Sequence, residues 1–182
     1  GELREPGAYK AVLDCTALGG REMLGLMTGA NPEPPATAQE RAVDKAVMLR
    51  GLEHCASHGI TGLHNMDGNF YQLELLAALE EDGDLLCRTE VPMHLKHTDP
   101  LDRIAEAAEM RASYNGDMVW SSRVKMFMDG VIDSRTAYML QPYPNTDSCS
   151  APLFSPEHFD EACSRIDAMG LQIAVHAIGD AA

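Results

Sequence analysis

The chain has 182 residues, of which 45% are hydrophobic and 23% charged, so it is apolar enough to form a core and is not an intrinsically disordered protein. Its 14 Lys and Arg against 28 Asp and Glu give a formal net charge of −14, which repels polyanions. We therefore expect neither nucleic acid nor an anionic membrane as a partner. The length fits one domain or part of a larger one.

The five cysteines are widely spaced and include no C-x-x-C pair, so they indicate neither a disulfide framework nor a zinc ribbon. We expect most of them to be buried small hydrophobic residues in a reducing compartment. No stretch approaches the ~18 consecutive apolar residues of a membrane span, and the start GELREPGAYK is not a signal sequence. These features predict a cytoplasmic protein, unless a leader precedes Gly1.

In chain order, residues 1–36 predict a loop-rich segment, because three prolines near its end interrupt regular structure. Thr37 and Glu40 then form a capping box that opens a long helix, and Gly59 is placed to end it. Beyond that helix, short apolar runs alternate with amphipathic segments. The runs predict strands at 60–67, 85–95, 123–130 and 171–178.

Helices are predicted between these strands, at 71–81, after Asp99 and Pro100, and after Ser155 and Pro156. Alternating strands and helices form right-handed βαβ units around a parallel sheet, so the fold class is α/β. The pattern fits either a doubly wound sheet or part of a (β/α)₈ barrel. The segment 131–154 is rich in Pro, Asn and Ser and predicts a long functional loop.

Titratable side chains lie in or near the end of every predicted strand, although a strand buried on both faces should be almost wholly apolar. In α/β folds the carboxyl ends of the strands form the binding face, so we expect these side chains to converge on one site. In strand order they are His64 and Asp67, His94 and His97, Lys125 and Asp129, and His176 and Asp180.

Lys125 is the most informative of these residues, because strand alternation places Val124 and Met126 on one face and Lys125 on the other. One interpretation is structural: an edge lysine, or half of a buried ion pair with Asp129. The other is chemical, since a lysine in a dry pocket loses its proton readily. Such an amine suits either Schiff-base chemistry or reaction with carbon dioxide to a metal-bridging carbamate.

His176 lies within an apolar strand, where a neutral imidazole is either a metal ligand or a core histidine bonded to a backbone carbonyl. Asp180, four residues later, is a candidate to orient a ligand or a substrate. His64 and Asp67 resemble this arrangement, but a structural role as caps of the following helix fits them slightly better. The other histidines are expected to be structural: His54, His58, His94, His97 and His158.

Three segments carry a resemblance to a known family: VKMFMDG at 124–130, DSRTA at 133–137 and GLQIAVHAIGDAA at 170–182. Supporting matches are LRE at 3–5 and GIT at 59–61. The sequence resembles the amidohydrolase superfamily, in the branch that includes N-substituted formamide deformylase. The resemblance implies a distorted (β/α)₈ barrel with one or two divalent metals, zinc foremost, at the strand ends. It also implies a hydrolase of amide-type, non-peptide carbon–nitrogen bonds in small molecules.

By the same resemblance, Lys125 on barrel strand 4 is the lysine that carbon dioxide converts to a carbamate, and His176 on strand 5 is a metal ligand. Family members also have an H-x-H pair on strand 1, a histidine on strand 6 and a general-base aspartate on strand 8, which this sequence lacks. We therefore expect a fragment of one barrel domain, covering about strands 2 to 5. It should be inactive alone and should form homo-oligomers through its open edges.

The expected substrate-binding residues are Asp129, Arg135, Asp180 and His64, although Arg135 fits as well as a surface partner of Asp133. Two other functions remain open. One is a Schiff-base lyase or aldolase that uses Lys125 without a metal. The other is a non-catalytic, self-associating module, which the missing ligands favour.

Overall fold

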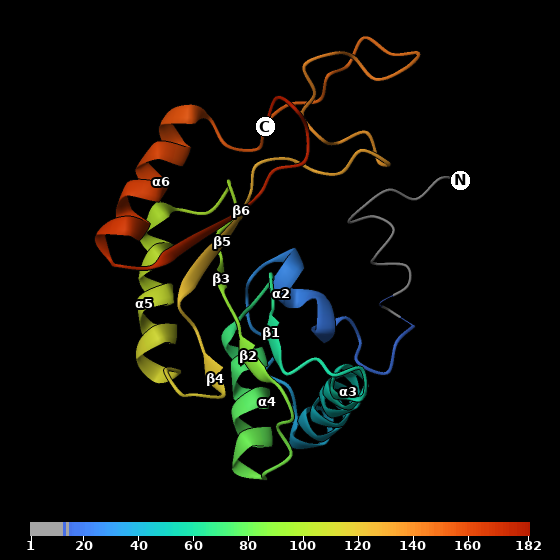
Figure 1. Ribbon diagram of the computed structural model, residues 1–182, viewed down its shortest axis with the longest axis vertical. Helices are drawn as coiled ribbons and strands as arrows, with labels where there is room; N and C mark the ends of the chain where they lie inside the picture. The colour runs from blue at the N-terminus through green and yellow to red at the C-terminus, as the bar shows by residue number, and fades with distance from the viewer. Residues whose placement is uncertain (1–12, 14) are drawn as a thin grey trace.

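The computed structural model describes residue 13 and residues 15–182, so the predicted match at 3–5 lies outside the described residues. Helices and strands alternate along the chain (Figure 1). The helical elements are η1 (Arg21–Met23), α2 (Leu24–Met27), α3 (Ala38–Ser57), α4 (Phe70–Glu81), η2 (Leu101–Arg103), α5 (Ile104–Ser113) and α6 (Pro156–Ala168). The strands are β1 (Gly62–His64), β2 (Arg88–Glu90), β3 (Met93–His94), β4 (Val119–Trp120), β5 (Arg123–Phe127) and β6 (Gln172–His176).

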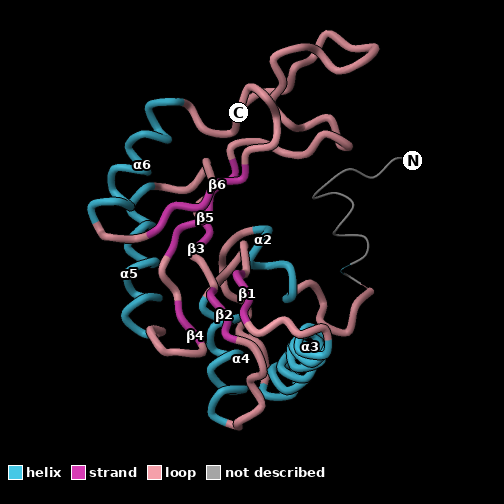
Figure 2. Tube along the Cα trace, in the orientation of Figure 1, coloured by secondary structure: helices cyan, strands magenta, loops and turns pink. Residues whose placement is uncertain are grey.

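These strands pair in parallel in two three-stranded sheets, ordered β1-β2-β4 and β3-β5-β6 (Figure 2). The predicted strand at 85–95 is divided into β2 and β3 at Pro92, which has no N–H to give to a ladder. β4 was not predicted, and it leads after two residues into β5. The described strands thus form four neighbouring paths in chain order: β1, β2–β3, β4–β5 and β6. They lack the reversal of strand order found in a doubly wound sheet.

Two of the predicted helix starts are confirmed by their hydrogen bonds. The Thr37 hydroxyl accepts from the Glu40 N–H at 3.2 Å, and the Glu40 carboxylate accepts from the Thr37 N–H at 2.8 Å. Ser155 caps α6, with proline at the first helical position. The prediction that Asp99 caps a helix was wrong, because its carboxylate pairs with Arg103 at 2.5 Å and a 3₁₀ turn begins at Leu101 instead.

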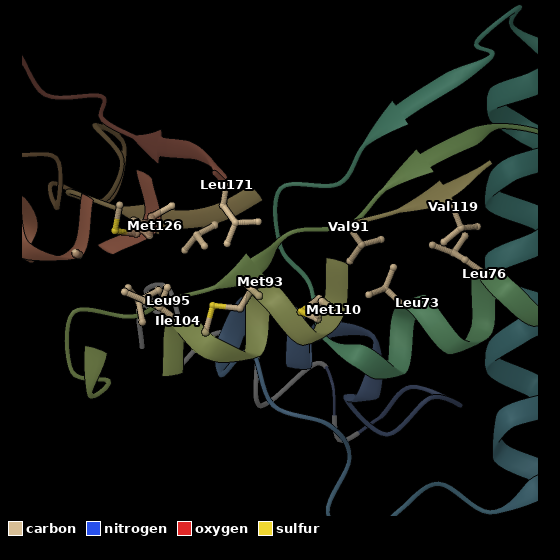
Figure 3. Packing of buried hydrophobic residues seen from close by; sticks show 14 of the residues in the cluster. Leu73, Leu76, Val91, Met93, Leu95, Ile104, Met110, Val119, Met126 and Leu171 are labelled. Atoms are coloured by element: carbon tan, nitrogen blue, oxygen red, sulfur yellow. The ribbon is translucent and has the colours of Figure 1, made fainter. Parts of the chain in front are cut away.

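The hydrophobic core lies between one face of the strands and helices α4, α5 and α6 (Figure 3). Its labelled members are Leu73, Leu76, Val91, Met93, Leu95, Ile104, Met110, Val119, Met126 and Leu171. Val124 and Met126 belong to this core, whereas Lys125 does not, which confirms the predicted alternation along β5. The opposite face of β5, which carries Lys125, is therefore outside the hydrophobic core.

The prediction that most cysteines are buried was wrong. Cys87 is buried with 0% exposure, Cys55 and Cys163 pack partly buried against the core, and Cys15 is exposed. Within the part of the chain that the structure describes, no helix is both long enough and apolar enough to cross a membrane.

Candidate active site

Strands β3, β5 and β6 bring three polar side chains together near their carboxyl ends. The strand register places His94 beside Lys125, and Phe127 beside His176. The Phe127 ring contacts both imidazoles, with its centroid 5.3 Å from that of His94 and 5.0 Å from that of His176. Lys125 Nζ lies 4.4 Å from the centroid of the same ring. The predicted convergence at the strand ends is confirmed for these residues.

A cavity of about 470 Å³ opens beside this cluster, a size suited to a small molecule. The residues of the cluster that line it are His94, Phe127 and His176. Its outer walls come from α2 and from the segment 131–154, which contains no helix or strand. His97 also lines the cavity, although the sequence indicated only a structural role.

Lys125 is only 6% exposed. Burial lowers the pKa of its ammonium group, although the negative charge of Asp67 acts in the opposite direction. Among the ion pairs of the described residues there is none between Lys125 and Asp129, because the Asp129 carboxylate is bonded elsewhere. Lys125 is therefore a buried amine that gives up its proton more readily than an exposed lysine.

Asp129 joins the end of β6 to the long loop. Its carboxylate accepts backbone hydrogen bonds from Tyr138 at 2.8 Å, Ile178 at 3.0 Å and Gly179 at 2.8 Å. Burial opposes ionisation of Asp129, but these three N–H donors outweigh it and lower its pKa. Asp129 lines the cavity, yet these contacts are those of a structural residue, so its predicted contact with substrate stays a prediction.

Two other predicted substrate residues do not line the cavity. Asp180 is exposed, and its carboxylate accepts from the Leu140 N–H at 2.7 Å, which again ties the chain after β6 to the long loop. Arg135 is exposed at a turn, with a positive φ of 57°. The loop pattern alone did not show which of its side chains face inward.

His64 belongs to a different cluster. Its Nδ1 lies 2.5 Å from Arg123 Nη2 and 3.9 Å from the Glu90 carboxylate. Glu90 is fully buried, and burial raises its pKa although Arg123 Nε lies 3.0 Å from its Oε2. His64 pairs with Arg123 and does not line the cavity. The prediction that all eight residues share one site was therefore wrong.

The His176 ring has one nitrogen committed to the backbone. Nε2 lies 2.8 Å from the Gly130 carbonyl oxygen, to which it donates as Nε2–H, and 3.9 Å from the Asp129 carboxylate. This assignment leaves Nδ1 as the ring nitrogen with the lone pair. The bond to a backbone carbonyl predicted by the structural interpretation is present, and the role of His176 as a metal ligand stays a prediction for an imidazole that lines the cavity.

His94 and Asp67 lie at the site, although neither was predicted to bind metal or substrate. His94 is 4% exposed, and its Nδ1 lies 3.0 Å from the Gly25 carbonyl oxygen; burial lowers its pKa. Asp67 has a buried Oδ1 without a hydrogen-bond partner in the described chain. Burial raises the pKa of Asp67, although the positive charges of His94, Lys125 and His176 act to lower it. Position at a strand end was the available signal for both residues.

The described residues supply only some of the side-chain ligands that a metal ion needs. No three His, Cys, Asp or Glu side chains of residue 13 and residues 15–182 lie close enough together to hold a metal. Lys125 and His176 fit such a site only as two of its donors, since catalytic zinc usually has three protein ligands.

Residues 8–182 match the model of the Amidohydrolase family. The chain belongs to the Amidohydrolase family. It is 27% identical over 156 residues to YtcJ of Bacillus subtilis, covering 82% of this chain and 27% of YtcJ. It is 33% identical over 79 residues to the exoenzymes regulatory protein AepA of Pectobacterium carotovorum, covering 43% of this chain and 17% of AepA.

Two solved structures share the fold, both of uncharacterized metal-dependent hydrolases. That from Pyrococcus horikoshii has a TM-score of 0.63 and 24% identity, over 80% of this chain and 29% of that one. That from Pyrococcus furiosus has a TM-score of 0.61 and 21% identity, over 90% of this chain and 32% of that one. The chain thus spans about a third or less of the length of each of these relatives.

Proposed function

We propose that this chain is part of a metal-dependent hydrolase of amide-type, non-peptide carbon–nitrogen bonds, and that it forms about strands 2 to 5 of a (β/α)₈ barrel. The observation that carries the proposal is Lys125, which is buried on β5 with its Nζ over the Phe127 ring, the same ring that contacts His176 of β6. Membership of the Amidohydrolase family supports the chemistry, and the order of the four parallel strand paths supports the barrel.

Lys125 and His176 would together hold a divalent metal. The neutral amine of Lys125 adds to carbon dioxide and loses a proton, which gives a carbamate with oxygen donors. Carboxylate-like oxygen and imidazole suit zinc, and also manganese, iron and nickel. In a hydrolase of this kind the metal supplies an activated water. The chain itself contributes the small-molecule cavity and, through Asp129, the fixed positions of the segments beside it.

The 182-residue chain should not hydrolyse amides by itself. Its described donors fall short of a full metal site, and the general base that the family uses has no counterpart in the sequence. Metal-dependent turnover of a simple amide by the isolated chain would contradict this expectation.

Carbon-13 NMR tests the role of Lys125 directly. With ¹³C-bicarbonate and zinc, we expect one carbamate signal that is absent from Lys125→Ala. Lys96→Ala is the matched control, because Lys96 lines the neighbouring cavity but is more exposed, with 32% of its side chain accessible. A signal that survives in Lys125→Ala, or the lack of any signal in the parent chain, counts against the carbamate.

A Schiff-base lyase or aldolase is the second candidate, favoured by the burial that lowers the pKa of Lys125. Borohydride would then trap a carbonyl compound on Lys125, and Lys125→Ala would abolish the trapping. A metal-dependent hydrolase forms no imine with a carbonyl compound, so borohydride should trap nothing on Lys125 in that case.

The third candidate function is that of a non-catalytic module, which would associate with further copies of the same chain. Val175 of β6 is 37% exposed and Ile178 beyond it 44% exposed, so apolar surface remains next to the unpaired side of β6. Sedimentation should reveal dimers or larger species, and a clean monomer would rule this out.

A further inference from the structure

The outer part of the cavity is mainly apolar. Leu26 and Met27 of α2 form one wall, and Val131 and Leu153 of the 131–154 segment form the other. Val131 is 36% exposed and Leu153 40% exposed, so both keep apolar surface in water. A ligand that covers this surface gains free energy from its removal from water.

Both walls are held in place by bonds to the strand ends, although neither belongs to a long regular element. Leu153 N–H donates to the Met128 carbonyl at 2.7 Å, just beyond β5. Within α2, the Gly25 carbonyl accepts from His94, and just after α2 a Cβ at Gly29 would lie 2.9 Å from the His94 carbonyl oxygen. The apolar walls are therefore fixed relative to His94 and β5.

The α2 wall has a second anchor away from the cavity. Arg21, at the start of η1, makes two hydrogen bonds to the Asp44 carboxylate, at 2.7 and 2.8 Å. The Tyr71 hydroxyl donates to the same carboxylate at 2.6 Å. The segment that carries Leu26 and Met27 is thus joined to both α3 and α4, which makes this wall a built feature of the fold.

The charges around the cavity disfavour a cationic ligand. Asp129 is the single acidic residue among the described lining residues, and its carboxylate is occupied by three backbone N–H groups. Lys96 lines the cavity as well, with Nζ 3.9 Å from Asp99. An ammonium or amidinium group would find no free carboxylate among the described residues that line the cavity, and it would lie near a lysine.

We propose that the cavity binds the apolar substituent of an uncharged amide, with the amide group at the end lined by His94 and His176, beside Lys125, and the substituent between Met27 and Leu153. This inference rests on the proposed hydrolase function and names the class of its substrate. The chain should therefore distinguish amides by the size and the charge of the group that they carry.

The test is a titration of the ¹⁵N-labelled chain, followed by NMR, with three probes: benzamide, acetamide and benzamidine. Benzamide should bind about tenfold or more tightly than acetamide, because its phenyl ring buries more apolar area than a methyl group. Benzamidine has nearly the same shape with a positive charge and should bind more weakly than benzamide. The shifted amide signals should include Phe127, Val131 and Leu153.

Leu153→Asn should weaken benzamide about fivefold or more. Leu140→Asn is the matched control, because Leu140 is in the same segment, is 65% exposed and does not line the cavity. Met27→Asn tests the opposite wall and should weaken benzamide as well. The ¹⁵N spectrum of each variant shows whether it is folded.

The proposal is overturned if acetamide matches benzamide, if benzamidine binds more tightly than benzamide, or if folded Leu153→Asn and Met27→Asn bind like Leu140→Asn. The titration needs neither metal nor turnover. A failed carbamate experiment therefore overturns the hydrolase mechanism without affecting this result, and a failed titration leaves the carbamate result intact.

Discussion

The ammonium nitrogen of Lys125 lies 4.4 Å from the centroid of the Phe127 ring, two residues along the same strand. A cation over an aromatic face is attracted by the ring, by about 0.5–2 kcal/mol. Phe127 thus supports the charged form of Lys125, while burial opposes it. The balance between these two effects sets how readily the amine becomes neutral.

Phe127→Leu should lower the pKa of Lys125 further, because the substitution removes the attraction of the ring and keeps an apolar side chain. Titration of the Lys125 side chain by NMR measures the change. Phe70→Leu is the control, since Phe70 packs against the core on the helical side and should leave that pKa unaltered. An unchanged pKa in Phe127→Leu would show that the ring contributes nothing.

Asp67→Asn should stabilise the chain at neutral pH by about 1–2 kcal/mol, because it removes a half-buried charge whose buried Oδ1 has no hydrogen-bond partner in the described chain. The pKa of Asp67 is raised in the folded state, so the folded chain binds the proton more tightly than the unfolded chain. The stability that this proton provides is complete below the unfolded pKa of ~3.9 and is lost as pH rises through the folded value.

Urea unfolding at pH 4 and pH 7 tests this sign. The advantage of Asp67→Asn should be larger at pH 7 than at pH 4. Asp147→Asn, at an exposed aspartate of the long loop, should change stability equally little at both values. An advantage that is larger at pH 4 would refute the assigned direction.

Asp129→Asn should destabilise the chain by about 2–4 kcal/mol, because an amide has one acceptor oxygen where three backbone N–H groups now meet a carboxylate. The folded pKa of Asp129 is lowered, so its stabilisation is present above the unfolded pKa of ~3.9 and is lost as pH falls through the folded value. Hydrogen exchange of the Tyr138, Ile178 and Gly179 amides should also become faster. Asp133→Asn, exposed in the same loop, should have little effect on either measurement.

Gly179→Ala should destabilise the chain by several kcal/mol, because a Cβ there would lie 1.8 Å from the Tyr138 carbonyl oxygen. Either the loop or the chain after β6 must move. Gly51→Ala, in the exposed middle of α3, has nothing within 4 Å and should stabilise the chain by up to about 1 kcal/mol. Thermal unfolding of the two variants should therefore give shifts of opposite sign.

The sequence by itself determined the features that depend on neighbouring residues. The capping box at Thr37 and Glu40 and the serine cap of α6 are local hydrogen bonds, and both are present. The placement of Lys125 on the face of β5 opposite Val124 follows from the two-residue period of a strand, and it is confirmed. Membership of the Amidohydrolase family likewise came from short motifs.

Only the tertiary structure decided which of the polar residues meet. His94 joins Lys125 because β3 and β5 pair in one particular register, whereas His64 turns to Arg123 instead. Asp129 accepts from residues 9, 49 and 50 positions away, and no local pattern encodes those partners. Side-chain period is local, but strand register and loop docking depend on packing between distant segments, which is why the elements were predictable and the membership of the site was not.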